Sequence, residues 1–375
     1  MPAIPDAFFR RSLAELVPYE PGKPVEEVQR ELGLERVVKL ASNEGPLGPF
    51  PEALAALERT APELNRYPDG GAYRLRATLA ERNGVAYEEV AVGAGADGIV
   101  DCVSQAVLDP GDEIVCGWPS FPSYVIYATK VGATAVRVPL RDQRYDLDAL
   151  LAAIGPRTKL AYICHPNNPT GTTNTRAELD AWFAAVPEHL LTVLDQAYLE
   201  YIDDPDYPDG VAEYFRAGRR VLVVRTFSKI FGLAGLRVGW AVGPAEVVAA
   251  LSKTRRAFDL TTQAQVAALA SLDGAEEIAR RRGLNARGRP DLERILAEAG
   301  LAVIPGSVAN FVCAEVGEAA DAVALFDALL RQGVIVRPLA GFGAPGAIRV
   351  TVGLPDEHAV LAEALSRVRQ AISAT

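Results

Sequence analysis

Short apolar runs alternate with helical patterns through the larger, N-terminal part of this chain. The runs are continuous stretches of β-branched residues and leucine, as expected for strands of a sheet that helices cover on both faces. Strands are predicted at Glu89–Gly93, Glu113–Gly117, Thr158–Cys164, Leu190–Leu194 and Val221–Val224. Helices are predicted at Ala96–Leu108, Leu147–Ile154 and Arg176–Val186. This alternation favours a doubly wound, mostly parallel α/β domain.

The C-terminal part of the chain has a different order of elements. After a long helical stretch, broken near Asp273-Gly274, strands are predicted at Phe311–Ala314, Val334–Pro338 and Ile348–Val352. Helices are predicted at Ala319–Arg331 and Glu357–Ile372. This α+β pattern predicts a smaller domain over residues 273–375, beside a large domain over residues 41–272. Residues 1–40 are expected to form an N-terminal arm that packs on the small domain or on a partner subunit.

Composition excludes several classes of function. No apolar run approaches the roughly 20 residues that span a bilayer, and the N-terminus lacks the order of a secretory signal. The formal net charge of -10 argues against nucleic acid or an anionic membrane as the main partner. Cysteines are scattered and show no CxxC pairing, so we expect neither a metal site nor a disulfide framework. We therefore expect the protein to be in a reducing, cytoplasmic compartment. The cysteines are Cys102, Cys116, Cys164 and Cys313.

Lys229 lies in the most informative stretch of the chain, Arg225–Arg237, where apolar residues surround a single amine. Burial disfavours the ammonium form, so such an amine can lose its proton near neutral pH and attack an aldehyde. Ser228 and Arg237 are suitable ligands for a phosphate. Pyridoxal 5'-phosphate is a cofactor that carries both an aldehyde and a phosphate. Alone, the stretch fits a surface lysine in a loop equally well.

Three further motifs follow predicted strands, where open α/β sheets place ligands. In the first, Gly93-Ala94-Gly95-Ala96-Asp97, the start of a helix offers backbone N–H groups to an anion. Asp97 is expected to contribute its backbone N–H, because its carboxylate would repel a phosphate. A nicotinamide-dinucleotide site is the rival interpretation, but this strand lies well inside the chain rather than near its start.

The second motif, His165–Gly171, is a turn stiffened by prolines, in which Asn168 can donate to a ring oxygen of the cofactor. His165 is expected to be structural. In the third motif, Asp195 leaves a buried strand and needs a partner. A protonated pyridine nitrogen is suitable, because this pairing keeps the ring cationic and able to accept electrons. Tyr198 can donate to the phenolic oxygen of the ring. Each motif alone also fits a plain turn, a helix cap or a core side chain.

With these motifs in this order, the chain resembles the fold-type I pyridoxal-phosphate-dependent aminotransferases, and within them the histidinol-phosphate aminotransferase family. The resemblance extends over nearly the whole chain. The segments Asn168–Gly171 and Ser228-Lys229 are specific for the superfamily. The segments Pro21–Pro24 and Leu40–Glu44 are more specific for the histidinol-phosphate branch. Further matches lie at Arg66–Gly70, Asp195–Tyr198 and Ile348–Gly353.

The resemblance implies a role for each matching residue. Lys229 would hold the cofactor as a Schiff base and move the substrate's proton, and Asp195 would pair with the pyridine nitrogen. Asn168 and Tyr198 would bind the ring oxygen, and Phe121 would stack on the ring. The phosphate would be held by Ala96, Asp97, Thr226, Ser228 and Arg237.

Substrate and subunit contacts are implied in the same way. Arg349 would bind the acidic group of the substrate, with Arg337, Asn168 and Tyr19 beside it. Tyr67 would reach the phosphate of the neighbouring subunit, which makes the expected active unit a homodimer. The expected substrates are a small amino donor and a 2-oxo acid acceptor, 2-oxoglutarate.

Three positions depart from the family pattern: Gly45 replaces a usual asparagine, Gln196 a usual glutamate, and Phe121 lacks a common hydroxyl. The first and third bear on the expected substrate pocket. Related sequences with a Trp-x-Ser-Phe segment resemble aromatic amino-acid aminotransferases, so this activity is an alternative. Decarboxylase or lyase chemistry on the same fold is a second alternative. A non-enzymatic regulator is disfavoured, because the roughly 40 residues before Ser42 hold no basic helix-turn-helix.

Overall fold

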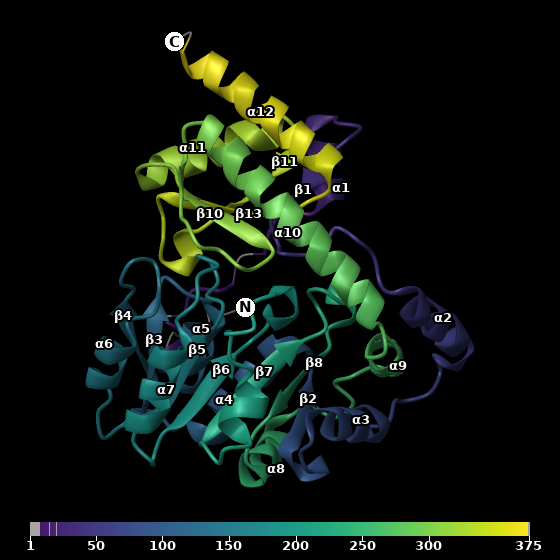
Figure 1. Ribbon diagram of the computed structural model, residues 1–375, viewed down its shortest axis with the longest axis vertical. Helices are drawn as coiled ribbons and strands as arrows, with labels where there is room; N and C mark the ends of the chain where they lie inside the picture. Colours follow the sequence, from purple (N-terminus) through teal and green to yellow (C-terminus); the bar gives the residue numbers. More distant parts are fainter. Residues whose placement is uncertain (1–7, 15, 20, 374–375) are drawn as a thin grey trace.

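The computed structural model describes residues 8–14, 16–19 and 21–373. Part of the predicted N-terminal arm, including Glu20 just before the Pro21–Pro24 segment, therefore lies outside the described residues. Figure 1 shows two bodies, one with a large sheet and one with a smaller sheet, and a long helix that runs from one to the other. In the described part of the chain, no helix is long and apolar enough to cross a membrane.

The large sheet has seven strands in the order β2-β8-β7-β6-β5-β3-β4. Only β8 runs against the others. Every residue of β6 and β7 is buried, because helices cover both faces of the sheet. The strands are β2 (Val90–Gly93), β3 (Glu113–Trp118), β4 (Thr134–Pro139), β5 (Thr158–Cys164), β6 (Leu191–Asp195), β7 (Val221–Thr226) and β8 (Gly239–Val242).

The helices of the large body lie between and beside these strands. They are α2 (Pro51–Thr60), α3 (Tyr73–Asn83), α4 (Gly95–Val107), α5 (Ser123–Val131), α6 (Leu147–Ala152), α7 (Arg176–Ala185), α8 (Ala245–Thr254) and α9 (Thr262–Ser271). Helix α4 begins two residues after β2 and packs on α5 and α8. Its N-terminus therefore lies at the edge of the sheet where the parallel strands end.

The small body contains a four-stranded antiparallel sheet, β12-β13-β10-β9. Residues from the N-terminal segment join it, since β1 pairs with β11 in parallel and α1 packs near Leu330. The elements are α1 (Val25–Leu32), β1 (Val38–Lys39), β9 (Ala302–Val303), β10 (Phe311–Glu315), α11 (Ala319–Arg331), β11 (Val334–Ile335), β12 (Arg337–Pro338), β13 (Ala347–Thr351) and α12 (Pro355–Ser373).

Helix α10 (Ala275–Glu298) connects the two bodies. In its first half, Arg281 donates hydrogen bonds to the backbone oxygens of Ile230 and Gly48 in the large body. In its second half, Leu292 and Leu296 are buried in the core of the small body. Pro290 lies between these halves. The proposed domain boundary at residues 272 and 273 falls just before this helix and stays a prediction.

One predicted strand is wrong in its extent. Val334–Pro338 is not a single strand but two, β11 and β12, which belong to different sheets. Val336 separates them and is itself buried, so the apolar run continues where the pairing changes. Strands β4 and β8 and helices α2, α3 and α5 were not predicted. Residues of β4 are mostly half-buried or exposed at the sheet edge, which leaves no continuous apolar run to detect.

Candidate active site

A cavity of about 750 Å³, open to solvent, lies where β5, β6 and β7 end beside the small sheet. Cys164, Asp195 and Thr226, the last residues of these strands, all line it. Every residue that the sequence predicts for the site lines this cavity except Tyr67. The lining residues are Tyr19, Ala41, Ser42, Asn43, Ala96, Asp97, Phe121, Cys164, Asn168, Asp195, Ala197, Tyr198, Thr226, Ser228, Lys229, Arg237, Arg337, Phe342 and Arg349.

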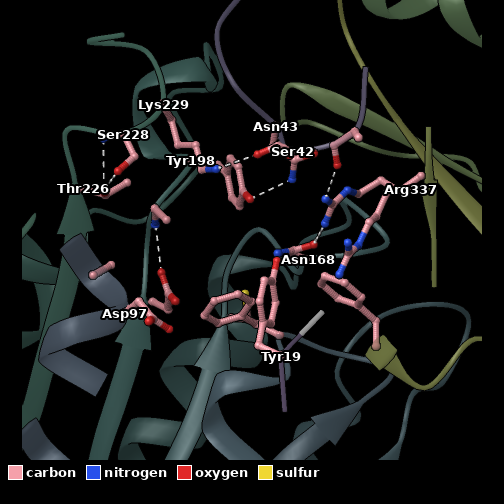
Figure 2. A pocket seen from close by; sticks show the side chains of 18 of the residues that line it. Tyr19, Ser42, Asn43, Asp97, Asn168, Tyr198, Thr226, Ser228, Lys229 and Arg337 are labelled. Carbon is pink, nitrogen blue, oxygen red and sulfur yellow. Dashed lines mark hydrogen bonds between the residues drawn. The ribbon is translucent and has the colours of Figure 1, made fainter. Parts of the chain in front are cut away.

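Lys229 follows β7 and extends its amine into the cavity (Figure 2). Its Nζ donates a hydrogen bond to the backbone oxygen of Ser42 at 3.3 Å and lies 5.6 Å from the centre of the Tyr198 ring. Burial, and then the positive charge of Arg349, lower the pKa of this amine from 10.5 to about 7. A large fraction of Lys229 is therefore neutral and nucleophilic at neutral pH.

Asp195 is a buried carboxylate at the end of β6. Its Oδ2 accepts a hydrogen bond from the Tyr124 hydroxyl at 2.7 Å, and its Oδ1 accepts one from the backbone N–H of Ala197 at 3.1 Å. Burial raises the pKa of this carboxyl, and the bond from Tyr124 opposes that rise. The described residues give Asp195 these donors but no ion-pair partner, so a cationic ligand atom would offset the cost of its burial.

The first turn of α4 provides a site for an anion, because its backbone N–H groups are not used within the helix. Gly95 has φ +78, and a Cβ there would lie 2.7 Å from Nη2 of Arg237. A Cβ on Gly239 in β8 would overlap the backbone nitrogen of Ala96. Only glycine at these two positions lets the guanidinium and the strand approach the start of the helix so closely.

Hydroxyl groups complete this anion site. Thr226 Oγ1 donates to Ser228 Oγ at 3.0 Å and accepts from the backbone N–H of Ser228 at 3.1 Å. Arg237 Nη1 donates to Ser228 Oγ at 3.4 Å. Two hydroxyls, a guanidinium and a helix N-terminus therefore meet at one end of the cavity, which is a suitable set of donors for a phosphate.

The carboxylate of Asp97 is occupied beside this anion site. It accepts hydrogen bonds from Ser123 Oγ at 2.5 Å and from the Tyr127 hydroxyl at 2.6 Å. Both donors lie on α5, so the carboxylate links α4 to α5. Its backbone N–H remains in the first turn of α4, where an anion would meet it.

Arg349 on β13 is a buried cation at the other end of the cavity. Its guanidinium donates to Oδ1 of Asn168 and, at 2.9 Å, to the backbone oxygen of Ala41. It lies over the rings of Phe311 and Phe342, and among the described residues its Nε has no hydrogen-bond partner. Burial lowers the pKa of Arg349, but a guanidinium keeps its charge. A buried cation without a carboxylate partner favours binding of an acidic ligand.

Arg337 on β12 adds a second cation at this end. Its guanidinium carbon lies 5.4 Å from the ring centres of both Tyr19 and Phe342. Figure 2 shows Arg337 and Asn168 on the same side of the cavity, with Tyr19 below them. Because Oδ1 of Asn168 accepts from Arg349, the amide nitrogen of Asn168 is the group left to donate to a ligand.

Several residues of the site were not assigned from the sequence. Asn43 donates to the Tyr198 oxygen at 2.9 Å, and Tyr124 donates to Asp195. The Leu40–Glu44 motif signalled the region of Asn43 but not its contact. Tyr124 stands three residues after Phe121, and this spacing was its only signal. Phe342 is the last residue of a short 3-10 helix, Ala340–Phe342, and has no signal in the sequence.

Four residues singled out in the sequence lie outside the cavity. The Tyr67 side chain is 82% exposed and stacks on Phe258, so its role toward another subunit stays a prediction. Gly45 lines a separate small cavity beside Tyr201, so the expectation that it bears on the substrate pocket stays a prediction. The other two are Gln196 and His165.

Gln196 and His165 have structural contacts. Gln196 donates to the backbone oxygen of Pro208 at 2.9 Å and accepts from the backbone N–H of Gly210 at 3.0 Å. His165 is hydrogen-bonded to Tyr207 and to the backbone oxygen of Asn174. Burial lowers the pKa of His165 to about 4, so the ring is neutral at pH 7. Both side chains therefore brace the loops behind the site.

The donor set fits a phosphorylated pyridine aldehyde such as pyridoxal 5'-phosphate. The anion site at α4 matches the phosphate, the amine of Lys229 matches the aldehyde, and Asp195 matches a protonated ring nitrogen. Among the described residues, no group of three histidine, cysteine or acidic side chains is arranged to hold a metal ion. The anion site, the Lys229 amine and the Asp195 carboxylate point to an organic cofactor, and the buried Arg349 points to an acidic substrate.

Comparison with known proteins agrees with this arrangement. The chain is 42% identical to histidinol-phosphate aminotransferase of Moorella thermoacetica over 96% of this chain and 92% of that protein. It is 44% identical to histidinol-phosphate aminotransferase 2 of Pseudomonas fluorescens over 96% of this chain and 97% of the relative. The crystal structure of histidinol-phosphate aminotransferase from Sinorhizobium meliloti, in complex with pyridoxal-5'-phosphate, superposes with a TM-score of 0.87. That chain is 29% identical, with 97% of this chain and 98% of the other covered.

A family model covers most of the sequence as well. The model of aminotransferase class I and II matches residues 35–367, a range that includes nearly every residue of the cavity. The fold, the motifs and these relatives lead to one assignment. The chain belongs to the class I and II aminotransferase family.

Proposed function

We propose that this protein is a pyridoxal 5'-phosphate-dependent histidinol-phosphate aminotransferase with 2-oxoglutarate as acceptor. The cofactor is supported by Lys229, whose pKa is lowered to about 7, in one cavity with the buried Asp195. The substrate is supported by the names of relatives at 42% and 44% identity. The observation that carries an acidic substrate is the buried Arg349, which has no carboxylate partner among the described residues.

Each side chain of the site would have a separate role in such a reaction. When bound, the cofactor supplies a carbonyl for the substrate amine and a ring that withdraws electrons from the substrate α-carbon. Lys229 would hold the cofactor through its amine and, as a free amine, would act as the general base that moves the α-proton of the substrate. The charge of Asp195 would keep the ring nitrogen protonated. Arg349 and Arg337 orient the substrate by its acidic group.

A homodimer is the second part of this proposal. Tyr67 is 82% exposed and stacks on the exposed Phe258, and Leu64 and Tyr73, close to it in the sequence, are also exposed. Such exposed aromatic and aliphatic side chains are suited to a subunit interface. We propose that Tyr67 reaches the phosphate of the partner subunit there. A cytoplasmic location is proposed from the four buried cysteines, none of which forms a disulfide.

A comparison of amino donors tests the substrate. With 2-oxoglutarate as acceptor, kcat/KM for histidinol phosphate is expected to exceed that for phenylalanine by about 10-fold to 100-fold. A phosphate can bind both arginines, and a charge-assisted hydrogen bond contributes about 1.5–3 kcal/mol. Steady-state kinetics measure both values. A preference for phenylalanine would instead assign an aromatic amino-acid aminotransferase, and release of CO2 without formation of pyridoxamine phosphate would assign a decarboxylase.

Capture of the cofactor by the cofactor-free protein is expected to depend on pH with a midpoint near 7. Only the neutral amine attacks the aldehyde, and the pKa of Lys229 is about 7 rather than 10.5. The rate should therefore rise from pH 5.5 to about pH 8 and then become constant. Stopped-flow absorbance after mixing with pyridoxal 5'-phosphate measures it. A rate that still rises tenfold for each pH unit above 9 would contradict the lowered pKa.

A further inference from the structure

Asn43 has an unusual backbone for a buried residue other than glycine. Its φ is +54, and its exposed fraction is 1%. Asparagine adopts this left-handed conformation more readily than most residues, and such a conformation persists where the surroundings fix it. Here the backbone N–H of Asn43 donates to Thr351 Oγ1 at 3.0 Å, and its backbone oxygen accepts from Asn310 Nδ2 at 3.1 Å. The residue is held on both sides.

The side-chain amide of Asn43 is held in one orientation. Thr351 Oγ1 donates to Oδ1 of Asn43 at 3.3 Å, which leaves Nδ2 facing the Tyr198 hydroxyl. Nδ2 donates to the Tyr198 oxygen at 2.9 Å (Figure 2). An amide nitrogen cannot accept a hydrogen bond. The single proton of the Tyr198 hydroxyl is therefore not used by Asn43 and can point into the cavity.

We propose that Asn43 is a positioning residue that directs the Tyr198 proton toward the ring oxygen of the bound cofactor. The inference rests on the proposed function and deepens it. Tyr198 is buried and has one proton to donate, so the identity of its other neighbour decides where that proton goes. A donor on the phenolic oxygen also polarises the hydroxyl and makes it a stronger donor to the cofactor.

Strand β13 connects this hydrogen bond to the substrate site. Thr351 stands two residues after Arg349, so their side chains leave the strand on the same face. Arg349 bonds to the backbone of Ala41, and Thr351 bonds to Asn43. One short strand thus contacts both the expected acidic group of the substrate and the amide that orients Tyr198.

The variant Asn43→Asp tests the inference, with the visible absorption band of bound pyridoxal 5'-phosphate as readout. Aspartate has nearly the same size and also tolerates the left-handed backbone, but its carboxylate accepts the Tyr198 proton. The ring oxygen then loses a donor, which disfavours its anionic form. The pH at which the band titrates should rise by about one to two units, the size of one lost charge-assisted hydrogen bond.

The background Tyr198→Phe separates this effect from the added charge. A direct effect of the carboxylate introduced by Asn43→Asp on the cofactor persists without the tyrosine, whereas the effect through the tyrosine proton disappears. We expect at most about half of the shift in the Tyr198→Phe background. Equal shifts in the two backgrounds would overturn the role of Asn43 and leave the proposed function intact. A wild-type protein that forms no such band would overturn the proposed function itself.

Thr351→Val provides a second variant if Asn43→Asp does not fold. It keeps the shape of the side chain, adds no charge and removes the hydroxyl that holds the amide of Asn43. We expect the titration to rise by a smaller amount, about half a unit, because the amide can then turn its oxygen toward Tyr198. An unchanged titration in Thr351→Val would overturn the inference.

Discussion

Replacing Lys229 with alanine is expected to lower kcat by more than about 10⁴-fold, the upper end of what a positioned general base contributes. The variant loses both the nucleophile that holds the cofactor and the base that moves the substrate proton. It should also lose the visible absorption band that forms between the cofactor and a lysine amine. Steady-state kinetics and absorbance of the purified variant measure the two losses separately.

The exposed Lys253 on α8 provides the matched control, since Lys253→Ala removes an amine of the same kind far from the cavity. Its activity should equal that of the wild type. A small amine such as methylamine added to Lys229→Ala should restore part of the turnover, because it replaces the missing base. Rescue would show that the variant is folded. Activity of Lys229→Ala near that of the wild type would reject the proposed reaction.

Replacing Asp195 with asparagine is expected to lower kcat by about 10²-fold to 10³-fold and to weaken binding of the cofactor. Breaking a buried ion pair costs about 3–5 kcal/mol, and the neutral amide cannot keep the ring nitrogen protonated. The change keeps the shape of the side chain, but the amide has a single acceptor oxygen, so only one of the bonds from Tyr124 and Ala197 keeps its acceptor. Cofactor titration by fluorescence and kinetics of the half-reaction measure the two effects.

Asp148 on α6 is an exposed carboxylate, and Asp148→Asn serves as the control for loss of one negative charge. It should not change kcat or cofactor affinity. Tyr124→Phe should lower kcat by about tenfold, because Asp195 keeps its charge but loses one donor worth about 1 kcal/mol. A larger loss in Tyr124→Phe than in Asp195→Asn would contradict the pairing of Asp195 with the ring.

The core of the large sheet could be predicted because its strands are buried on both faces. β5, β6 and β7 appear as continuous apolar runs, and the predicted Thr158–Cys164 has the same bounds as β5. Elements with mixed exposure were missed. Helix α3 buries only Leu75, Leu79 and Ala80 among many charged residues, so its apolar stripe is weak. The change from one sheet to the other at Val336 could not be predicted, because the run of buried apolar residues continues through this position.

The site divides in a similar way. Residues at strand ends or a few positions after them, such as Asp195, Asn168 and Lys229, could be predicted because parallel strands bring their ends together. Residues that act through a distant partner could not. Asn43 and Tyr198 are 155 positions apart, and Tyr124 and Asp195 are 71 positions apart. Nothing in a local pattern indicates which of many polar residues meet across such distances.

The long helix α10 connects the two bodies and contains a proline between its two halves. Its first half is bonded to the large body through Arg281, and its second half is buried in the core of the small body. Pro290 has no N–H to donate, so the backbone oxygen of Ala286 lacks its usual helical partner there. Bending at this joint therefore breaks one hydrogen bond fewer than bending elsewhere in the helix.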